Sequence, residues 1–185
     1  MTETDPSGPA SDWTEKARAI GDRARRAARL LERVGTAART DALRAMARGL
    51  RDQADALQAD NQADLADARD TGLSSAMIDR LALGPERIEK MARSLEAVAD
   101  LRDPVGEILE GYVRPNGLRI QRVRVPIGVV LTIYESRPNV TSDVAGLCLK
   151  SGNAAVLRGG KESLRSNLAI HRVLAEALTA TNLPA

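Results

Sequence analysis

The chain has 185 residues, 43% of them hydrophobic and 28% charged, which is typical of a globular protein with a substantial core. Its 27 basic and 25 acidic side chains nearly balance, and aromatic residues make up only 2%, so the composition favours neither a polyanionic partner nor single-strand nucleic-acid binding. The single cysteine excludes an internal disulfide, and no stretch reaches the roughly eighteen apolar residues of a membrane span, so we expect a cytoplasmic protein that binds neither nucleic acid nor membranes.

The N-terminal half of the sequence predicts a helical layer. Residues 1–11 are polar and interrupted by prolines and a glycine, and we expect them to form a disordered tail. Asp12 has the spacing of a capping-box residue at the start of the first helical pattern. A second long helix is predicted from about Thr36 past Leu65, and shorter helices follow before residue 102.

The first predicted helix is rich in arginine, at positions Arg23, Arg25, Arg26, Arg29 and Arg33. A helix with this many arginines could bind a nucleic acid or a membrane surface. The same pattern also suits a solvated helix face whose arginine stems cover an alanine-rich core stripe. We favour the solvated face.

Residues 103–125 predict a β-hairpin. Two β-like runs, 106–113 and 118–125, flank an Arg-Pro-Asn-Gly turn sequence, in which proline fixes φ and glycine accepts a positive φ. The hydrophobic alternation changes parity in the second run, which predicts a bulge near Gln121-Arg122. Such a hairpin braces a domain or pairs with another subunit.

Residues 126–185 predict a βαβα unit. The apolar run over 129–133 is typical of a strand buried on both faces of a parallel sheet, and a second strand is predicted over 154–157. Parallel strands need a helical crossover, and one of the polar residues 141–143 is expected to cap that helix. A last helix is predicted over 163–179. The fold class is therefore α/β, with a helical layer, a hairpin and a parallel βαβα unit.

Polar residues and glycines gather where the two predicted strands end. Ser136, Arg137 and Asn139 follow the first strand, and Arg158, Gly159, Gly160 and Lys161 follow the second. Ligands of open α/β sheets bind at the carboxyl ends of the strands, so both turns are expected to face one crevice. An arginine there can clamp a carboxylate or phosphate, an asparagine amide or backbone N–H can stabilise an oxyanion, and a glycine turn before a helix can hold a phosphate. A purely structural glycine turn, and a capped loop in which Arg137 pairs with Glu135, remain alternatives.

Two residues that invite a chemical role are interpreted as structural. Cys148 lies between two leucines inside a predicted helix, with no histidine near in sequence, and this is typical of a buried cysteine rather than a nucleophile. His171 is the only histidine of the chain, so no metal site is predicted.

The motifs Val-Pro-Ile-Gly-Val, Tyr-Glu-Ser-Arg-Pro-Asn-Val-Thr, Leu-Cys-Leu-Lys-Ser-Gly-Asn and Leu-Arg-Gly-Gly closely resemble those of the gamma-glutamyl phosphate reductase family. This family is also called glutamate-5-semialdehyde dehydrogenase and belongs to the aldehyde dehydrogenase superfamily. The resemblance runs from about residue 14 to the end of the chain, and the segment Asp79-Arg80-Leu81 contributes to it. The combination of motifs is highly specific.

The resemblance implies an aldehyde-dehydrogenase-like fold and the NADPH-dependent reduction of L-glutamyl 5-phosphate to L-glutamate 5-semialdehyde with release of phosphate, the second step of proline biosynthesis. Family members attack the acyl phosphate with a cysteine thiolate and then transfer hydride. Arg158 falls where related dehydrogenases place a basic side chain on the adenosine ribose. Lys161 falls where NAD-preferring relatives often carry a glutamate, so a cation there suits the 2′-phosphate of NADP(H). Ser136, Arg137 and Asn139 fall near the substrate and oxyanion region.

The resemblance also implies a division of the chain into parts. Residues 12–102 form the N-terminal helical part of the cofactor domain, residues 103–125 the bracing or oligomerisation hairpin, and residues 126–185 the start of a Rossmann-like NADP-binding sheet. The chain covers less than half of a usual member, and the catalytic cysteine of the family is expected beyond residue 185. We therefore expect a fragment that is inactive alone.

Partners follow from the same resemblance. It implies a small-molecule substrate, L-glutamyl 5-phosphate, a homo-oligomer when full length, and channelling with glutamate 5-kinase. One alternative function is a non-catalytic nucleotide-binding or subunit-interaction module made from the same fold. An electrostatic nucleic-acid binder that uses the arginine-rich helix is a third hypothesis.

Overall fold

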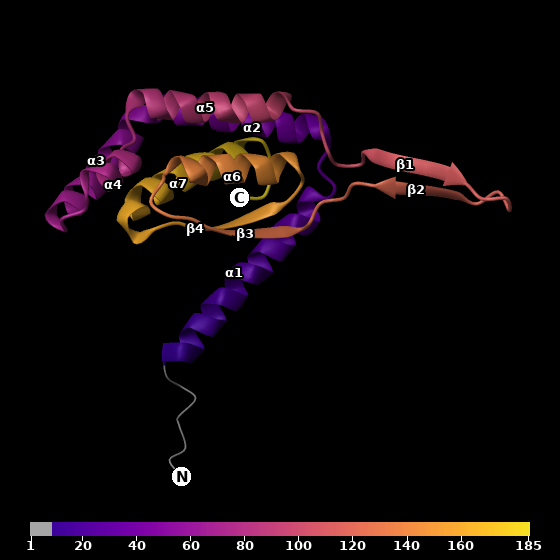
Figure 1. Ribbon diagram of the computed structural model, residues 1–185, viewed down its shortest axis with the longest axis horizontal. Helices are drawn as coiled ribbons and strands as arrows, with labels where there is room; N and C mark the ends of the chain where they lie inside the picture. The colour runs from indigo at the N-terminus through magenta and orange to yellow at the C-terminus, as the bar shows by residue number, and fades with distance from the viewer. Residues whose placement is uncertain (1–8) are drawn as a thin grey trace, which may run out of the picture.

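The computed structural model describes residues 9–185 and places a helical layer before two small sheets (Figure 1). The helical layer consists of α1 (Pro9–Leu31), α2 (Thr36–Asp52), α3 (Ala54–Asp70), α4 (Ser75–Leu81) and α5 (Pro85–Asp100). The hairpin strands are β1 (Ile108–Val113) and β2 (Arg119–Val123). The remainder comprises β3 (Val129–Ile133), α6 (Asn139–Lys150), β4 (Ala154–Arg158), the 3₁₀ turn η1 (Lys161–Ser163) and α7 (Leu164–Ala180).

The chain enters the first helix earlier than the sequence pattern predicted. The predicted tail over residues 1–11 falls mainly outside the described residues, and α1 already begins at Pro9 rather than at Asp12. Proline is accepted at the start of a helix, because the N–H that it lacks has no partner in the first turn. The arginines of α1 are exposed while Ala24, Ala28 and Leu31 are buried, which is the arrangement that the solvated-face interpretation predicts.

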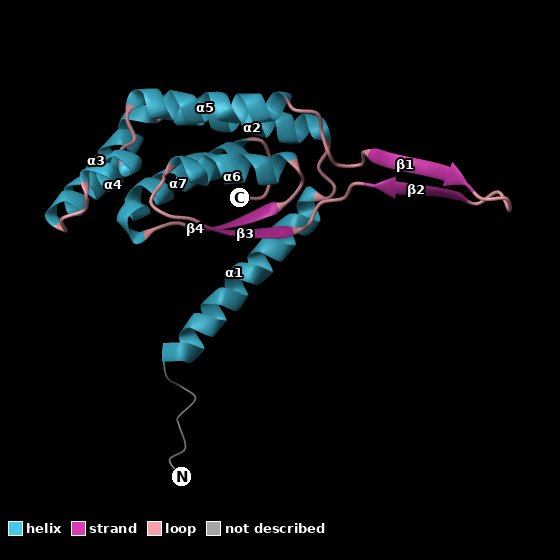
Figure 2. Cartoon of the chain, viewed as in Figure 1, coloured by secondary structure: helices cyan, strands magenta, loops and turns pink. Residues whose placement is uncertain are grey.

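Strands β3 and β4 form a parallel pair with helices on both sides. Their register runs from Val129 opposite Ala154 to Ile133 opposite Arg158, so the two strands end at the same level. Figure 2 shows α6 and α7 on one side of this pair and α1 on the other. The predicted βαβα unit is therefore confirmed, and so is the α/β fold class. The expected burial of the first strand on both faces is wrong, because Leu131 and Ile133 of β3 are 61% and 70% exposed.

Two predicted elements differ in detail. The single long helix predicted from Thr36 past Leu65 is wrong, because the chain breaks at Gln53 into α2 and α3. The break lets α2 pack mainly on α5 while α3 packs on α7. In the hairpin the predicted irregularity lies on the opposite strand, where Leu109 of β1 is the extra residue in the pairing with β2.

The main apolar core lies between α2, α5 and α7. It is built around Leu43, Leu50, Ile88, Leu95 and Ile170, each of which is at most 1% exposed. Burial of aliphatic surface on this scale is the dominant contribution to holding the helical layer on the α/β part. Within residues 9–185, no helix is both long enough and apolar enough to cross a membrane.

A buried polar network fastens α3 to α7. The Asp64 carboxylate, 4% exposed, accepts hydrogen bonds from the Ser166 backbone N–H at 2.8 Å and from the Ser166 hydroxyl at 2.7 Å. It also accepts the backbone N–H of Arg165 at 3.3 Å. The neighbouring Asn61 amide donates to the Ser166 hydroxyl at 2.9 Å and accepts the Leu83 N–H at 2.7 Å. The first turn of α7 is thus capped by a carboxylate from another helix, where the helix dipole favours negative charge.

This cap gives a first prediction. Asp64→Ala leaves buried N–H groups of α7 without an acceptor, and we expect the free energy of unfolding to fall by about 2 kcal/mol. Urea denaturation of the chain measures the change. Asp67→Ala is the matched control, because the exposed Asp67 side chain pairs only with Arg165 and its loss is expected to cost less than about 1 kcal/mol. Equal losses for the two variants would show that Asp64 does not act as a cap.

Candidate functional site

The turns that follow β3 and β4 lie against each other. Beyond the last register pair, the Tyr134 N–H donates to the Arg158 carbonyl at 3.0 Å. The Ser136 hydroxyl then donates to Oε2 of Glu162 at 2.8 Å, across from one turn to the other. The two turns therefore meet at one edge of the sheet, with Ser136 as the contact from the first turn. Glu162, which joins them, was not singled out from the sequence.

Gly159 and Gly160 are needed for this close approach. Neither has a positive φ, so their conformation alone does not require glycine. A Cβ on Gly159 would lie 2.3 Å from Nδ2 of Asn167 and 3.1 Å from the Tyr134 ring, and one on Gly160 would lie 2.6 Å from Oγ of Ser136. A side chain at either glycine would therefore collide with other residues of this chain. This geometry supports a structural turn as one role of the pair.

A hydroxyl and amide network holds the first turn of α6 against α7. Thr141 Oγ1 is 2.7 Å from the Tyr134 hydroxyl and donates to Oδ1 of Asn167 at 3.1 Å. The Asn167 amide in turn donates to the Ser163 hydroxyl at 3.0 Å. Helix α6 begins at Asn139, so the predicted cap at Thr141 or its two following neighbours is wrong. The Thr141 hydroxyl is engaged by tertiary partners instead of by the helix start.

Arg158 and Lys161 supply free positive charge beside this edge. Both side chains are exposed, and within residues 9–185 neither forms an ion pair or a side-chain hydrogen bond. The pKa of the nearby Glu162 carboxyl is lowered, first by its own backbone N–H and the Ser136 hydroxyl, and further by the charges of Lys161 and Arg158. Glu162 is thus a carboxylate that Ser136 holds, while the two cations remain available to an anion.

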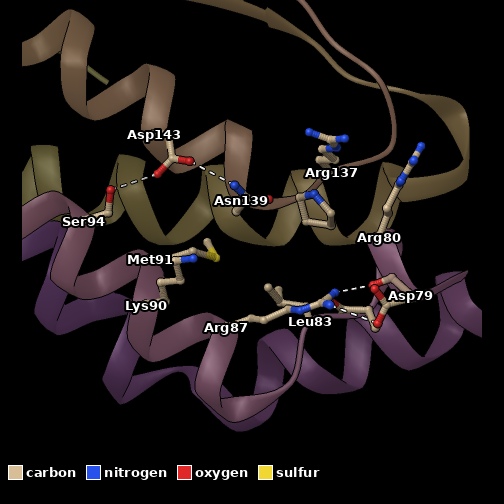
Figure 3. Close-up of a pocket in the computed structure, with 12 residues that line it drawn as sticks. Asp79, Arg80, Leu83, Arg87, Lys90, Met91, Ser94, Arg137, Asn139 and Asp143 are labelled. Atoms are coloured by element: carbon tan, nitrogen blue, oxygen red, sulfur yellow. Dashed lines mark hydrogen bonds and ion pairs between the residues drawn. The ribbon is translucent and has the colours of Figure 1, made fainter. Parts of the chain in front are cut away.

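Arg137 and Asn139 belong to a different surface. They line a cavity of about 280 Å³ between α4, α5 and the start of α6, whereas Ser136 does not (Figure 3). The alternative in which Arg137 pairs with the Glu135 side chain is not seen; only the Arg137 N–H reaches the Glu135 carbonyl, at 2.8 Å. The three residues Ser136, Arg137 and Asn139 therefore do not form one cluster.

Several cavity residues lie far away in the sequence. Arg80, Arg87 and Lys90 come from α4 and α5, and they share the cavity with Asp143 of α6. Their spacing follows no chemical motif, so periodicity alone did not mark them as site residues. The signal that points to Arg80 is the Asp79-Arg80-Leu81 segment, which belongs to the resemblance described above.

Cys148 and His171 have no place in either surface. Cys148 is 7% exposed within α6, and burial raises the pKa of its thiol. This confirms its interpretation as a buried cysteine, because a nucleophilic thiol needs a lowered pKa. His171 is exposed on α7. In the part of the chain that the structure describes, no group of three His, Cys, Asp or Glu residues is placed to hold a metal ion.

The close contact of the two turns yields a second prediction. Gly159→Ala forces a methyl group against the Tyr134 ring and the hydrogen-bonded Asn167 amide, and we expect a loss of about 1–3 kcal/mol in the free energy of unfolding. Gly21→Ala in α1 is the control, because a Cβ there has no neighbour within 4 Å and a helix favours alanine. Thermal and urea unfolding measure both variants. A Gly159→Ala chain as stable as the parent would mean that the turns are not in contact.

Comparison with known proteins agrees with the motif resemblance, although no family model matches the chain. The gamma-glutamyl phosphate reductase of Rhodospirillum rubrum is 58% identical over 165 residues, which cover 89% of this chain and 39% of that protein. The crystal structure of gamma-glutamyl phosphate reductase from Thermotoga maritima has a TM-score of 0.86 and 43% sequence identity, over 88% of this chain and 39% of that chain.

More distant structures share the fold. A probable aldehyde dehydrogenase from Listeria monocytogenes has a TM-score of 0.67 at 16% sequence identity, over 92% of this chain and 35% of that chain. The chain thus spans about two fifths of the length of the curated relatives that it matches, 39% in the Rhodospirillum rubrum protein. The resemblance seen in the sequence motifs is confirmed, and over the length that it spans the chain matches one part of gamma-glutamyl phosphate reductase, with the fold of the aldehyde dehydrogenases.

Proposed function

We propose that this chain is part of an enzyme that reduces L-glutamyl 5-phosphate to L-glutamate 5-semialdehyde with NADPH and releases phosphate, as a step of proline biosynthesis. The observation that carries the proposal is the 58% identity over 165 residues to a gamma-glutamyl phosphate reductase. Since the chain spans 39% of that relative, it contributes one part of the activity rather than the whole. The contribution of its own residues is argued from the two surfaces described above.

The surface at the end of β4 fits a nicotinamide dinucleotide phosphate. Arg158 and Lys161 are exposed and unpaired among the described residues, and the one adjacent carboxylate, Glu162, is held by Ser136. We assign Arg158 to the adenosine ribose and Lys161 to the 2′-phosphate, where a charge-assisted contact is strong. Gly159 and Gly160 form the intervening turn of this cofactor surface. When bound, the cofactor supplies hydride.

The turn after β3 fits the substrate side of the reaction. Asn139 uses one amide hydrogen for Asp143, at 3.0 Å, and its amide has a second hydrogen to donate to a developing oxyanion. The Ser136 hydroxyl proton is directed at Glu162, so its oxygen is left to accept rather than donate. We therefore assign the oxyanion role to Asn139 and the anion-binding role to Arg137.

The hairpin supports a homo-oligomer of the complete enzyme. Strand β1 has six consecutive exposed residues, among them Ile108, Leu109, Tyr112 and Val113. Exposed apolar surface of this kind marks an interaction site. We assign the hairpin over residues 103–125 to a subunit contact, and channelling with glutamate 5-kinase stays a prediction.

The cofactor assignment is tested by binding. Lys161→Glu replaces the cation proposed for the 2′-phosphate, and we expect NADPH to bind about tenfold more weakly while NADH binding is much less affected. Fluorescence titration of the 185-residue chain measures both affinities. Lys16→Glu makes the same charge change in α1, where the ammonium pairs with the exposed Asp12 and lies 4.9 Å from the centroid of the Trp13 ring. Equal NADPH affinity in parent and Lys161→Glu chains would refute the assignment.

The cysteine chemistry gives a further prediction. The only thiol of the chain, Cys148, is buried with a raised pKa, so the chain has no residue suited to form a thioacyl intermediate. We expect no phosphate-dependent reduction of NADP⁺ by the purified chain with glutamate semialdehyde as substrate. Absorbance at the NADPH band follows the reaction. Turnover that disappears in a Cys148→Ser variant would overturn this expectation.

A further inference from the structure

The cavity between α4, α5 and α6 contains positive charge that the protein does not neutralise. Arg80 of α4, Lys90 of α5 and Arg137 before α6 line it, and none of the three has a hydrogen-bond or ion-pair partner for its side chain within residues 9–185. A fourth lining cation, Arg87, is engaged by the Asp79 carboxylate at 3.0 Å. Figure 3 shows the resulting difference, with dashed interactions at Arg87 and none at the other three.

One carboxylate of the cavity is held in place and still has capacity. Asp143 is half-buried in α6 and accepts hydrogen bonds from the Ser94 hydroxyl at 3.2 Å and the Asn139 amide at 3.0 Å. A carboxylate has about four lone-pair positions, so two remain for a further donor. Because both hydrogen bonds fix its orientation, Asp143 is a preorganised acceptor on the α6 side of the cavity, where Ser94 of α5 reaches it (Figure 3).

The lining is therefore of mixed sign, and this limits what the cavity can bind. Of its two carboxylates, Asp79 is paired with Arg87, so three unpaired cations stand against the Asp143 carboxylate and favour a ligand with net negative charge. A phosphate dianion alone would meet the repulsion of that carboxylate. A group that carries an anion and an ammonium together would satisfy both sets of side chains. The volume of about 280 Å³ is that of a small-molecule site.

We propose that this cavity binds the amino-acid end of the substrate, with the α-carboxylate against Lys90, Arg137 and Arg80 and the α-ammonium against Asp143. This inference rests on the proposed function, because Arg137 and Asn139 connect the cavity to the turn where the acyl group reacts. The cavity then selects acyl phosphates that carry a free α-amino acid group. A site with polar groups that need partners discriminates strongly against analogues that lack them.

The test uses NMR titration of the 185-residue chain with three small molecules. L-glutamate carries both groups, glutarate lacks the α-ammonium, and 4-aminobutyrate lacks the α-carboxylate. We expect L-glutamate to bind most tightly and to shift the backbone amides around Lys90, Arg137 and Asp143. Inorganic phosphate is the fourth probe, and we expect it to bind more weakly than L-glutamate. Tighter binding of phosphate at the same amides would overturn the proposal in favour of a simple anion site.

Two variants test the contacts proposed for the α-carboxylate and for the α-ammonium of the ligand separately. Lys90→Ala is expected to weaken L-glutamate and glutarate about tenfold each, whereas Asp143→Asn is expected to weaken L-glutamate and 4-aminobutyrate, which carry the ammonium, and to leave glutarate unchanged. Arg93→Ala is the control, since Arg93 lies on the same helix, pairs with Glu89 and does not line the cavity. Unfolding midpoints show that the variants are folded. Unchanged affinities in the first two variants, or no shift at the cavity amides with L-glutamate, would refute the proposal.

The outcome is separable from that of the cofactor assignment. The L-glutamate titrations contain no dinucleotide, and the NADPH titrations contain no amino acid. Binding of L-glutamate at the cavity without NADPH binding at Lys161 would count against the cofactor role alone. NADPH binding at Lys161 without L-glutamate at Lys90 and Asp143 would count against the cavity alone.

Discussion

The parallel pairing of β3 and β4 is the constraint on which both functional surfaces depend. Because Ile133 lies opposite Arg158, both strands end at the same edge of the sheet, and the two turns that follow them must pack closely against each other. The absence of a Cβ at Gly159 and Gly160 makes that possible. The hydrogen bond between Ser136 and Glu162 then joins the turns. Residues that are 26 positions apart in the sequence, such as Ser136 and Glu162, are thereby brought into contact.

A second constraint connects the two surfaces to one scaffold. Asn61 donates to the Leu81 carbonyl at 2.9 Å and accepts the Leu83 N–H at 2.7 Å, which fixes the link between α4 and α5 that forms part of the cavity wall. The same amide reaches the Ser166 hydroxyl at the start of α7, just after the cationic turn. A buried side chain in α3 thus sets the position of the cavity and of the turn after β4 together. Such fully satisfied buried networks specify one arrangement of the elements around them.

The sequence predicted the topology well because its signals were local or periodic. The apolar run of β3, the crossover helix and the glycine-containing turn are each encoded in a few neighbouring residues, and the family motifs fall in the same segment. The break at Gln53 was missed, since the helical period of α2 and α3 is continuous and only tertiary packing separates them. The cap of α6 was sought among residues 141–143 for a similar reason, because Tyr134 and Asn167, the tertiary partners of Thr141, are not marked by any local pattern.

The candidate site was predicted only in part, and the reason is geometric. Consecutive residues of a turn point in different directions, so Ser136 faces Glu162 while Arg137 lines the cavity on the side of α5. A list of adjacent polar residues therefore mixes two environments with different partners. The two environments differ in which charged groups already have partners, and this difference is not visible in the sequence. At the β4 turn the carboxylate of Glu162 is occupied by Ser136 and the cations face solvent, whereas in the cavity Asp143 retains acceptor capacity among unpaired cations. The first environment accommodates an anion, and the second requires a ligand that carries both signs.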